Sequence, residues 1–455
     1  MSTIAAISTA PAIGGIGIIR LSGEDSFKIL EKIFIPKNKF KTQEIKGNTI
    51  KYGHIVCDGK TIDEVLVSYF KAPKSYTTED MCEINSHGGT VIVKKILEIC
   101  LKSGAVLAEP GEFTKRAFLN GRIDLAQAES VIDIINAKTN KEVEASVKQL
   151  NGFLSKEISV IKKQIMNLMV DIEASIDYPE YDTPEVTYDN AIDTLEKVKK
   201  QLIDLSNSFE SGKIIKDGIS LAIIGKPNAG KSSLLNELLK EERAIVTDIE
   251  GTTRDTIEEQ IIIEGIPFKI IDTAGIRNSN DKIEQIGIEK SKNAAKESDV
   301  ILAVFDVSKE LDEEDLEILK FTENKKTIII ANKIDLQENK NTLKKLQQTG
   351  KDVVEISVLT KNGIEDINKK LMEMFNLKEI ELDNGNIITN LRHKQLIDSA
   401  TNSSEEAINA LKSNLPVDII AINIKDILEN LGKITGETVS DDIIKEIFAK
   451  FCLGK

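Results

Sequence analysis

The chain has few cysteines, and their spacing limits the chemistry that they can support. Cys57, Cys82, Cys100 and Cys452 form no C-x-x-C pair and have no histidine pair nearby. Structural zinc sites and disulfide frameworks depend on closely spaced ligands or on paired cysteines. The sequence therefore argues against a zinc site or a disulfide scaffold, and it indicates free thiols in a reducing compartment.

Long apolar segments and basic runs are missing as well. No apolar stretch approaches the roughly 20 residues that span a bilayer. The first residues lack the basic segment that opens a secretory signal. We therefore expect a cytoplasmic protein without a membrane partner. The net charge of −14 predicts that the surface as a whole repels phosphate backbones, so contact with nucleic acid needs a local basic patch or a partner chain.

The length and the residue pattern predict several domains, because 455 residues are too many for one ordinary core. Residues 1–120 combine short β-like runs, at 16–21 and 65–69, with one expected helix over 90–103, and so predict a compact α+β domain. Residues 121–217 place apolar side chains at three- and four-residue steps, which is typical of helices in a bundle. This apolar stripe comprises Val147, Leu150, Leu154, Ile158, Ile161, Ile165, Leu168 and Ile172.

The pattern of apolar residues changes twice in the rest of the chain. Residues 218–378 alternate apolar strands with helical segments, and helical periodicity returns over 379–455. The alternation predicts a parallel sheet covered by helices on both faces, that is, a doubly wound α/β domain. We expect this domain to be inserted into the helical domain, whose two parts flank it. The expected strands are 220–224, 268–271, 300–305, 327–331 and 353–356.

A phosphate-binding motif directly follows the first of these strands. Residues 225–232 read Gly-Lys-Pro-Asn-Ala-Gly-Lys-Ser, which is the G-x-x-x-x-G-K-S pattern. Its glycines let backbone N–H groups surround phosphates at a helix N-terminus. Lys231 adds charge at the β- and γ-phosphates, and Ser232 offers a hydroxyl to magnesium. A glycine turn can match by chance, but the strand before and the helix former after the motif favour a nucleotide site.

Two further segments predict groups for the γ-phosphate and for magnesium. The segment 272–275, Asp-Thr-Ala-Gly, ends an expected strand. There Asp272 can hold the magnesium shell through water, and the Gly275 N–H can meet the γ-phosphate. The segment 251–255 lies between these two motifs, where a mobile loop should supply a second magnesium hydroxyl. Thr253 is the candidate.

The segment 332–335, Asn-Lys-Ile-Asp, predicts selection of guanine over adenine. The carboxylate of Asp335 can accept hydrogen bonds from both N1–H and N2–H₂ of guanine, and adenine has no such donor pair. Lys333 can lie over the base, and Asn332 can tie this loop to the phosphate loop. The segment 357–359, Ser-Val-Leu, would complete the base site. All these motifs in this order indicate a Ras-like P-loop GTPase domain.

The group that orients the attacking water differs from the one in Ras-like enzymes, which carry glutamine directly after the Asp-x-x-Gly motif. Here that position is Ile276, which cannot orient water. Either hydrolysis is slow or another group substitutes. Glu284 can orient water as a carboxylate, and Arg277 or Arg254 can act as an arginine finger. A bound monovalent cation can neutralise the same charge, with the side-chain amide oxygen of Asn228 as a ligand.

Taken together, the motifs resemble those of the MnmE (TrmE) family of tRNA-modification GTPases over nearly all of the chain. In the GTPase segment the resemblance is carried by residues 225–233, 247–255 and 272–277. Outside it, the matching segments are 110–120 with 124–129, and 451–455. These outer segments make the resemblance specific, because related ribosome-assembly GTPases lack them.

The resemblance implies ligands for two ions and a catalytic residue. Potassium would be held by Asn228, the backbone of Thr247 and Ile249, and Thr252, and magnesium by Ser232 and Thr253. Two GTPase domains would meet face to face, which would order residues 247–253 and bring the catalytic Glu284 to the attacking water. The residues expected at GTP are Asn228, Ala229, Gly230, Lys231, Ser232, Ser233, Thr247, Asp248, Ile249, Glu250, Gly251, Thr252, Thr253, Asp272, Thr273, Ala274, Gly275, Asn332, Lys333, Asp335, Ser357, Val358 and Leu359.

The resemblance also implies a folate site in the N-terminal domain, where a tetrahydrofolate derivative (5-formyl or 5,10-methylene) is the one-carbon donor. The matching positions are Arg20, Glu83, Arg122 and Lys455. Arginine and lysine suit the carboxylates of the glutamate tail, and Glu83 suits the donor edge of a pterin. Position 122 is arginine where lysine is usual in some members. Without the resemblance, Arg20 and Glu83 would be interpreted as surface charges, and residues 13–17 as a turn that leads into a strand.

Cys452 allows two interpretations. Its thiolate could take part in the carbon transfer. Alternatively, it is a small apolar residue near the folate site. No sequence neighbour clearly activates the thiol, which favours the second interpretation.

The predicted function is that of the GTPase subunit of a complex that modifies the wobble uridine of certain tRNAs. The resemblance implies a flavin-dependent partner subunit of the MnmG type in a heterotetramer, a homodimer formed through the N-terminal domains, and a 5-aminomethyl or 5-carboxymethylaminomethyl uridine as product. One alternative is a ribosome-assembly or translation GTPase, which would need a basic RNA-binding module that the sequence does not offer. Another is a non-catalytic GTP-switch scaffold, which Ile276 suggests.

Overall fold

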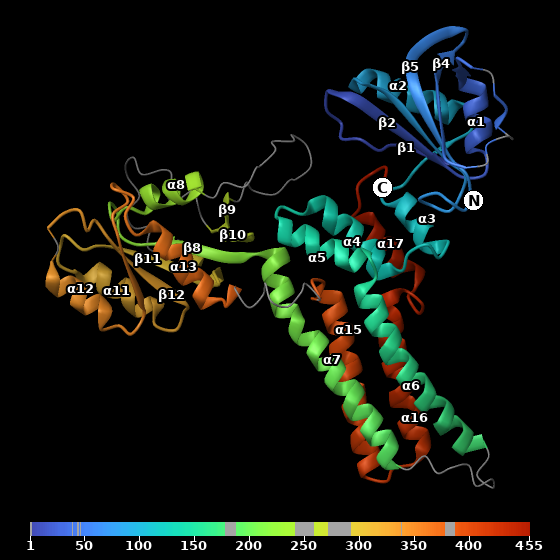
Figure 1. Cartoon of the computed structure of the whole chain (residues 1–455). Coiled ribbons are helices and arrows are strands. Elements are labelled where there is room, and N and C mark those ends of the chain that lie inside the picture. Colours follow the sequence, from blue (N-terminus) through green and yellow to red (C-terminus); the bar gives the residue numbers. More distant parts are fainter. Residues whose placement is uncertain are drawn as a thin grey trace. The chain divides into compact units, whose positions relative to one another are not determined.

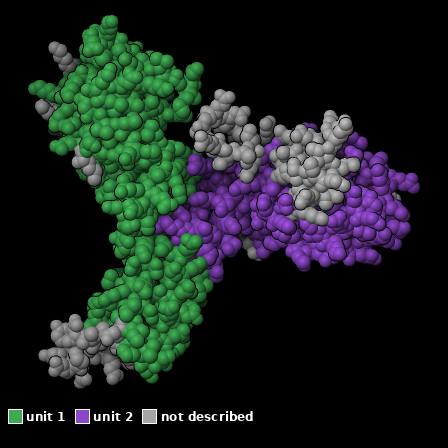
Figure 2. Space-filling model, turned by 180° about the vertical axis from the view of Figure 1, so that it is seen from behind, with its two compact units in different colours: residues 1–135, 149–203, 395–455 green, residues 136–148, 204–394 purple. Residues whose placement is uncertain are grey.

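The computed structural model consists of two compact units. Unit 1 comprises residues 1–135, 149–203 and 395–455, and unit 2 comprises residues 136–148 and 204–394 (Figure 2). Within the described part of the chain, no helix is both long enough and apolar enough to cross a bilayer. The described residues are 2–38, 40–42, 45, 47–177, 188–241, 259–271, 293–337, 339–377 and 387–455.

The N-terminal part of unit 1 is built on a seven-stranded sheet of order β3-β4-β5-β6-β2-β1-β7. Neighbouring strands pair antiparallel, and only the edge strand β7 pairs in parallel, with β1. This sheet, together with the helices on it, confirms the α+β prediction for the beginning of the chain. The strands are β1 (Ile4–Ile7), β2 (Gly14–Ser22), β3 (Phe34–Pro36), β4 (Thr49–Cys57), β5 (Lys60–Phe70), β6 (Met81–Gly88) and β7 (Val106–Leu107).

Burial alternates along the strands of this sheet, so that one face forms the core. In β5, Val67 and Tyr69 are 0% and 1% exposed, whereas Leu66 is 48% exposed. A period of two places every second side chain on the same face. The helices α1 (Ser26–Ile33) and α2 (Thr90–Lys102) pack their apolar residues against the buried face (Figure 1).

The register between β2 and β6 decides which charges meet. β2 begins at Gly14, so residues 14–17, which we expected to form a turn before the strand, already belong to the strand. In this register Arg20 lies directly opposite Glu83. Residues that lie directly opposite each other in neighbouring antiparallel strands have Cβ atoms about 4.5–5.5 Å apart, which is close enough for opposite charges to interact.

Helices form the rest of unit 1. Within it, α6 and α16 lie side by side (Figure 1). Apolar residues of α6 at three- and four-residue steps are buried, which confirms the predicted stripe from Leu154 onward. The helices are α3 (Glu112–Leu119), α4 (Leu125–Asn136), α6 (Phe153–Asp177), α16 (Val417–Thr435) and α17 (Asp441–Ala449), with the larger parts of α7 (Tyr188–Asp217) and α15 (Leu391–Lys412).

The first part of the predicted stripe differs from the structure. Val147 lies on a separate helix, α5 (Asn140–Leu150), and is 38% exposed. Gly152, at a φ of 80°, separates α5 from α6, so the apolar periodicity does not continue through this turn. The loop that we expected around Pro179 and Pro184 lies outside the described residues.

Unit 2 contains a six-stranded sheet of order β13-β12-β11-β8-β10-β9. All neighbours pair in parallel except the edge hairpin of β9 and β10. The predicted strands and their parallel pairing are confirmed, but β9 was not predicted. It is joined to β10 by a two-residue turn at Glu264 and Gly265, whose positive φ angles suit a tight hairpin. The strands are β8 (Ile219–Ile224), β9 (Glu259–Ile263), β10 (Ile266–Ile270), β11 (Val300–Asp306), β12 (Thr327–Asn332) and β13 (Asp352–Ile356).

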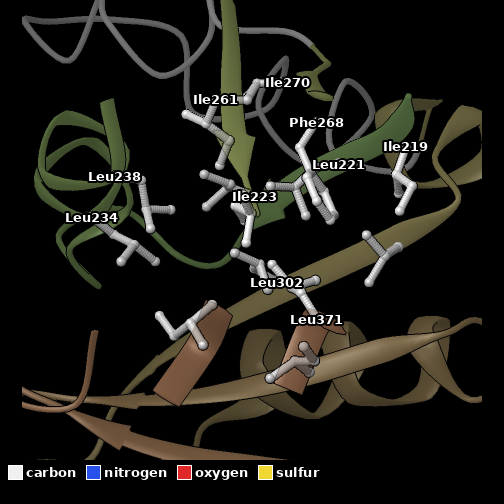
Figure 3. Close-up of a cluster of buried hydrophobic side chains, with 14 of the residues drawn as sticks. Ile219, Leu221, Ile223, Leu234, Leu238, Ile261, Phe268, Ile270, Leu302 and Leu371 are labelled. Carbon is white, nitrogen blue, oxygen red and sulfur yellow. The ribbon is translucent and has the colours of Figure 1, made fainter. Parts of the chain in front are cut away.

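Both faces of this sheet are buried, which explains why its parallel strands are nearly continuous apolar runs. In β8, Leu221 and Ile223 belong to one core, and Ala222 and Ile224 to the core on the other face. Helices α8 (Lys231–Glu241) and α13 (Ile364–Met374) contribute to the first core, part of which Figure 3 shows. The partly buried residues of α11 (Glu313–Thr322) and Leu346 of α12 (Lys340–Gln347) pack in the second.

Candidate functional site

The phosphate-loop motif connects β8 to α8, and two of its glycines are required by close contacts, one with backbone and one with a side chain. Gly225 has a φ of 152°, and a Cβ there would lie 2.4 Å from the carbonyl oxygen of Val304. Gly230 has a φ of 105°, and a Cβ there would lie 2.2 Å from Nδ2 of Asn332. A side chain at either position would clash as well as strain the backbone. The loop therefore runs directly against β11 and β12.

Lys231 lies at the centre of this loop. Its Nζ donates hydrogen bonds to the carbonyl oxygens of Gly225 and Lys226, at 2.6 and 2.7 Å. Burial lowers the pKa of Lys231 to about 8. Of the other expected residues in the loop, Asn228 is exposed at a positive φ of 64°, and Ser232 is the second residue of α8. A partly buried ammonium held by the carbonyl oxygens of a glycine-rich loop, at the start of a helix, is an arrangement suited to a polyphosphate.

Asn332, at the end of β12, joins the phosphate loop to the loop that follows β13. Its Nδ2 donates to the carbonyl oxygen of Ala229 at 2.8 Å, and its Oδ1 accepts from the N–H of Val358 at 3.3 Å. Only 2% of the residue is exposed. Because both ends of one buried amide are used, the two loops are held at a defined separation.

The carboxylate of Asp335 is held by the same region. The hydroxyl of Ser357 donates to Oδ1 of Asp335 at 2.5 Å and accepts from the N–H of Thr360 at 3.2 Å. Val358 is partly buried and Leu359 is exposed beside them. One oxygen of Asp335 is thus oriented by Ser357, and the carboxylate keeps acceptor capacity for the donor edge of a base.

Lys333 has a partner that the sequence did not suggest. The residue has a φ of 73°, and its Nζ pairs with Oδ2 of Asp306 at 2.6 Å. Burial by itself would raise the pKa of Asp306, but hydrogen bonds from Lys333 and Ser308 outweigh it and lower that pKa. Asp306 is the last residue of β11, next to β12 in the sheet. Its position at the carboxyl end of a parallel strand could have identified Asp306 as a candidate site residue from the sequence.

The phosphate loop is also anchored to α11. Nζ of Lys226 pairs with Asp312, the N-cap of α11, and with Asp315 at 2.9 Å. The side chain of Asp312 accepts from the N–H groups of Glu314 and Asp315, which forms a capping box. This anchor was not predicted. The sequence does carry a pattern typical of a helix start, because the acidic residue Asp312 is followed three positions later by a second acidic residue, Asp315.

Part of the expected nucleotide site lies outside the described residues. The expected residues concerned are Thr247, Asp248, Ile249, Glu250, Gly251, Thr252, Thr253, Asp272, Thr273, Ala274, Gly275 and Glu284. The same is true of Ile276 and of the two arginines considered as fingers, Arg254 and Arg277.

A second group of expected residues meets in unit 1. Arg20 and Glu83, opposite one another in the sheet, form an ion pair in which Nε and Nη2 lie 2.9 and 2.8 Å from Oε1 of Glu83. Nη1 of Arg20 donates to the carbonyl oxygen of Gly454 at 3.3 Å. Both contacts with Glu83 use Oε1, so Oε2 is the oxygen positioned to accept from a ligand.

Tyr76 links this ion pair to Arg122. The Cζ atom of Arg122 lies 4.5 Å from the centre of the Tyr76 ring, and that of Arg20 lies 5.5 Å from it. The ring of Phe113 lies 5.6 Å from the same atom of Arg20. These distances allow cation–π contacts. Tyr76 and Phe113 were not predicted as site residues, because no local pattern distinguishes them from other aromatic residues.

Lys455 enters the same neighbourhood through its backbone. Its carbonyl oxygen accepts from the N–H of Phe113 at 3.2 Å. The carbonyl oxygen of Gly454 also accepts from the hydroxyl of Ser8 at 3.0 Å. The structure therefore brings Arg20, Glu83 and Arg122 together around Tyr76, with residues 454 and 455 beside them.

The side chain of Cys452 is exposed. This exposure contradicts neither interpretation of the residue, and both stay predictions. Its neighbour Phe451 is buried in a cluster with Phe448 and Ala117. The carbonyl oxygen of Cys452 accepts from the N–H of Gly111 at 3.3 Å, so the backbone of this residue is held while its side chain faces outward.

The two groups of residues suit different ligands. The loop around Lys231 offers an ammonium, N–H groups and a serine hydroxyl, which suit a polyphosphate with magnesium. The group around Tyr76 offers two guanidinium forks and one carboxylate. Guanidinium groups bind carboxylates in a bidentate manner, and a carboxylate oxygen accepts from an N–H edge. A planar heterocycle that carries a carboxylate tail fits this second set.

Comparison with known proteins covers nearly the whole chain. The family model described as the GTP-binding protein TrmE N-terminus matches residues 3–122, and that of the MnmE helical domain matches residues 125–452. A protein of Acetivibrio thermocellus named tRNA modification GTPase MnmE is 50% identical over 457 residues, which cover 100% of this chain and 99% of the relative. Proteins of the same name from Clostridioides difficile and Alkaliphilus oremlandii are 47% and 46% identical, with the same coverage. With most of its length matched by these models and relatives, the chain belongs to the MnmE family of tRNA modification GTPases.

Proposed function

We propose that this chain is a cytoplasmic GTPase that takes part in tRNA modification. In this proposal residues 1–120 form a folate-binding and dimerisation domain. Residues 218–378 form a Ras-like P-loop GTPase domain, which is inserted between the two parts of a helical domain, 121–217 and 379–455. The doubly wound sheet of unit 2 and the loops at the carboxyl ends of its parallel strands support the GTPase assignment.

The contact that supports guanine-nucleotide binding most directly is the double hydrogen bond of Asn332. It holds the loop around Lys231, which would bind phosphates, beside the loop around Asp335, which would bind the base. Lys231 would give up its two carbonyl contacts for the β- and γ-phosphates. Asp335, oriented by Ser357, would accept from N1–H and N2–H₂ of guanine. Ser232 and Thr253 would hold magnesium, which would neutralise phosphate charge.

Hydrolysis would depend on residues that compensate for Ile276. Glu284 would orient the attacking water in place of the glutamine of Ras-like enzymes. Potassium would be held by Asn228, Thr247, Ile249 and Thr252, and would supply the positive charge that an arginine finger provides elsewhere. The exposed side chain of Asn228, at a left-handed turn of the phosphate loop, supports this assignment.

A tetrahydrofolate derivative would bind around Tyr76 and supply the one-carbon group. Arg20, Arg122 and Lys455 would bind the carboxylates of its tail, and Glu83 would accept from the N–H edge of its pterin. The ion pair between Arg20 and Glu83, and the contacts of both arginines with one aromatic ring, support a common site for these residues.

The product would be a 5-aminomethyl or 5-carboxymethylaminomethyl group on the wobble uridine of certain tRNAs. The chain would act as a homodimer in a heterotetramer with a flavin-dependent partner of the MnmG type. The net charge of −14 supports this division, because a partner could then supply much of the surface that binds tRNA.

Nucleoside mass spectrometry of tRNA from cells that lack this gene tests the proposed role. We expect the modified wobble uridines to disappear and to return when the gene is restored, but not when the restored gene carries Asp335→Asn. Unchanged wobble uridines in the deletion strain would refute the tRNA role, although GTP binding by the purified chain would still stand.

Multiple-turnover GTPase assays in potassium and in sodium test the cation. We expect faster turnover in potassium, and loss of this difference in the Asn228→Ala chain. Asn236→Ala, an exposed position on α8, is the matched control and should keep the difference. Equally slow turnover in both salts would refute potassium activation and favour a switch scaffold.

A further inference from the structure

Residues 71–80 connect β5 to β6 and carry Tyr76, the ring that contacts both arginines of the proposed folate site. The ladder hydrogen bonds of the sheet end before this segment, at Phe70 and Met81. Its position is set by turns within the segment, by a hydrogen bond from the N–H of Gly23 to the carbonyl oxygen of Asp80, and by side-chain contacts. The side-chain hydrogen bonds with other segments lead to α3, to the residue that ends it and to the end of β2.

The central contact is made by Arg116 of α3, a buried cation that is 3% exposed. Its Nη1 donates to both carboxylate oxygens of Glu79, at 3.2 and 3.1 Å. Its Nη2 and Nε donate to Oε1 of Glu112, at 2.7 and 3.3 Å. One planar guanidinium thus joins a carboxylate of its own helix to a carboxylate of the connecting segment, a geometry that an ammonium cannot reproduce.

Further hydrogen bonds hold the segment on both sides of Glu79 and Tyr76. The hydroxyl of Ser22 donates to Oε2 of Glu79 at 2.7 Å and lies 2.6 Å from the hydroxyl of Thr77. Nδ2 of Asn120 donates to the carbonyl oxygen of Thr77 at 2.7 Å. The hydroxyl of Tyr76 itself lies 2.9 Å from that of Thr114 in α3. Tyr76 is therefore fixed through its hydroxyl and through the residues that follow it.

We propose that Arg116 is a positioning residue of the N-terminal site. By holding Glu79 it fixes residues 71–80, so that Tyr76 keeps the guanidinium groups of Arg20 and Arg122 close together. Two like charges repel one another, and contact with the electron-rich face of one ring offsets part of that repulsion. The result is two guanidinium groups on one ring, of which that of Arg20 also pairs with Glu83 and that of Arg122 can bind a carboxylate. This inference rests on the proposed folate function. It also gives a role to Arg116, a residue of the family-matching segment 110–120 to which neither the nucleotide site nor the folate site assigns a function.

The test measures two properties of the full-length chain. The first is the affinity for 5-formyltetrahydrofolate by titration calorimetry. The second is the amide hydrogen exchange of residues 71–80 by mass spectrometry, which needs no ligand. The Arg116→Lys chain keeps the charge but loses the fork. We expect at least about tenfold weaker folate binding, since hydrogen bonds to charged groups are lost, and faster exchange in residues 71–80.

Other variants separate positioning from stability. Glu79→Gln removes the charge that Arg116 holds but keeps the side-chain shape, and it should weaken binding in the same direction. Tyr76→Leu should weaken binding at least about tenfold, whereas Tyr76→Phe, which keeps the ring, should stay within about threefold of the wild type. The control is Glu437→Gln, which breaks an ion pair with Lys162 elsewhere in unit 1 and should change neither readout.

The outcomes are distinguishable. Unchanged exchange of residues 71–80 in both the Arg116→Lys and Glu79→Gln chains refutes the proposal. So does exchange that rises while folate affinity stays within about twofold of the wild type. If the wild-type chain does not bind 5-formyltetrahydrofolate at all, the proposed folate function fails and this role of Arg116 fails with it. If the wild type binds and Tyr76→Leu binds equally well, the folate function stands and the positioning role is refuted.

Discussion

The two candidate sites of this chain are built in opposite ways. In unit 2, the groups around Lys231, Asn332 and Ser357 lie in loops that directly follow parallel strands of one sheet. In unit 1, Arg20 and Glu83 are 63 positions apart and meet only because β2 and β6 pair in one register. Tyr76 and Arg122 come from other segments.

The contrast follows from strand direction. The carboxyl ends of parallel strands meet at one edge of a sheet, so each loop brings a short, contiguous motif to the same place. In an antiparallel sheet, residues that face each other lie in different strands, and their spacing in the chain carries no fixed pattern. A site of the first kind can be recognised in a sequence, and a site of the second kind needs the fold.

The charge at the nucleotide site depends on pH. Burial lowers the pKa of Lys231 to about 8, so its ammonium can lose a proton in a mildly alkaline buffer. The affinity of this site for phosphates is therefore expected to change near pH 8.

The largest expected effect concerns the base. Asp335→Asn replaces an acceptor-only carboxylate by an amide that cannot accept both guanine donors. GTP affinity should fall about 100-fold or more, because two charge-assisted hydrogen bonds are lost, while the weak affinity for ATP stays the same. Competition with a fluorescent guanine nucleotide measures this. Asp352→Asn, an exposed carboxylate paired with Lys370, is the control. An unchanged preference for GTP over ATP would contradict the base assignment.

A somewhat smaller effect is expected in the N-terminal site. Arg20→Met removes one fork and leaves the carboxylate of Glu83 without that partner. The affinity for 5-formyltetrahydrofolate should fall about 30-fold, because a charged hydrogen-bond donor is lost from a partly buried position. Calorimetry measures it. Lys37→Met removes another cation that lies over an aromatic ring, Tyr52, and should have no effect on folate affinity. Equal losses in both chains would indicate a general effect of charge.

The pH response of the nucleotide site can be measured directly. GTP phosphates favour the charged form of Lys231, so binding takes up a proton above the pKa of about 8. GTP affinity should fall about tenfold from pH 7 to pH 9. Calorimetry in buffers of different ionisation enthalpy measures the proton uptake. Lys231→Arg should show none near pH 8. A flat GTP profile in the wild type would contradict the assignment of Lys231.

The same group affects folding stability with a defined sign. The folded pKa of Lys231, about 8, lies below its ordinary value of 10.5, so the unfolded chain binds more protons between these values. The contribution of Lys231 to the free energy of unfolding therefore rises as pH increases from about 8 toward 10.5 in the nucleotide-free chain.

The smallest effect concerns the anchor of the phosphate loop on α11. Asp315→Asn removes one of the two carboxylates that hold Lys226. GTP affinity should fall only about threefold, because the more exposed Asp312 still pairs with the ammonium of Lys226. Glu314→Gln, one residue away on the same helix, is the matched control and should have no effect on GTP affinity. A loss as large as that of Asp335→Asn would mean that Lys226 contacts the nucleotide directly.

Much of the fold could be predicted from the chain alone. The five strands predicted for unit 2 are present because both faces of that sheet are buried, which makes each strand a continuous apolar run. The edge strand β9 was missed, since a turn of only Glu264 and Gly265 separates it from β10. The stripe on α6 was recognised by its helical period, but its apparent extension to Val147 crosses the turn at Gly152.

The amino-acid sequence by itself determined the motifs at residues 225–232 and 332–335, the parallel pairing of the strands that precede them, and the family to which the chain belongs. Short local patterns encode these features, because a turn, a strand end and the N-terminus of a helix each restrict which residue types can occupy the nearby positions. Only the tertiary structure decided that Lys226 is anchored by Asp315, that Tyr76 contacts two arginines, and that Arg116 holds the segment carrying that ring. Those contacts join residues from different elements, and packing and register bring them together.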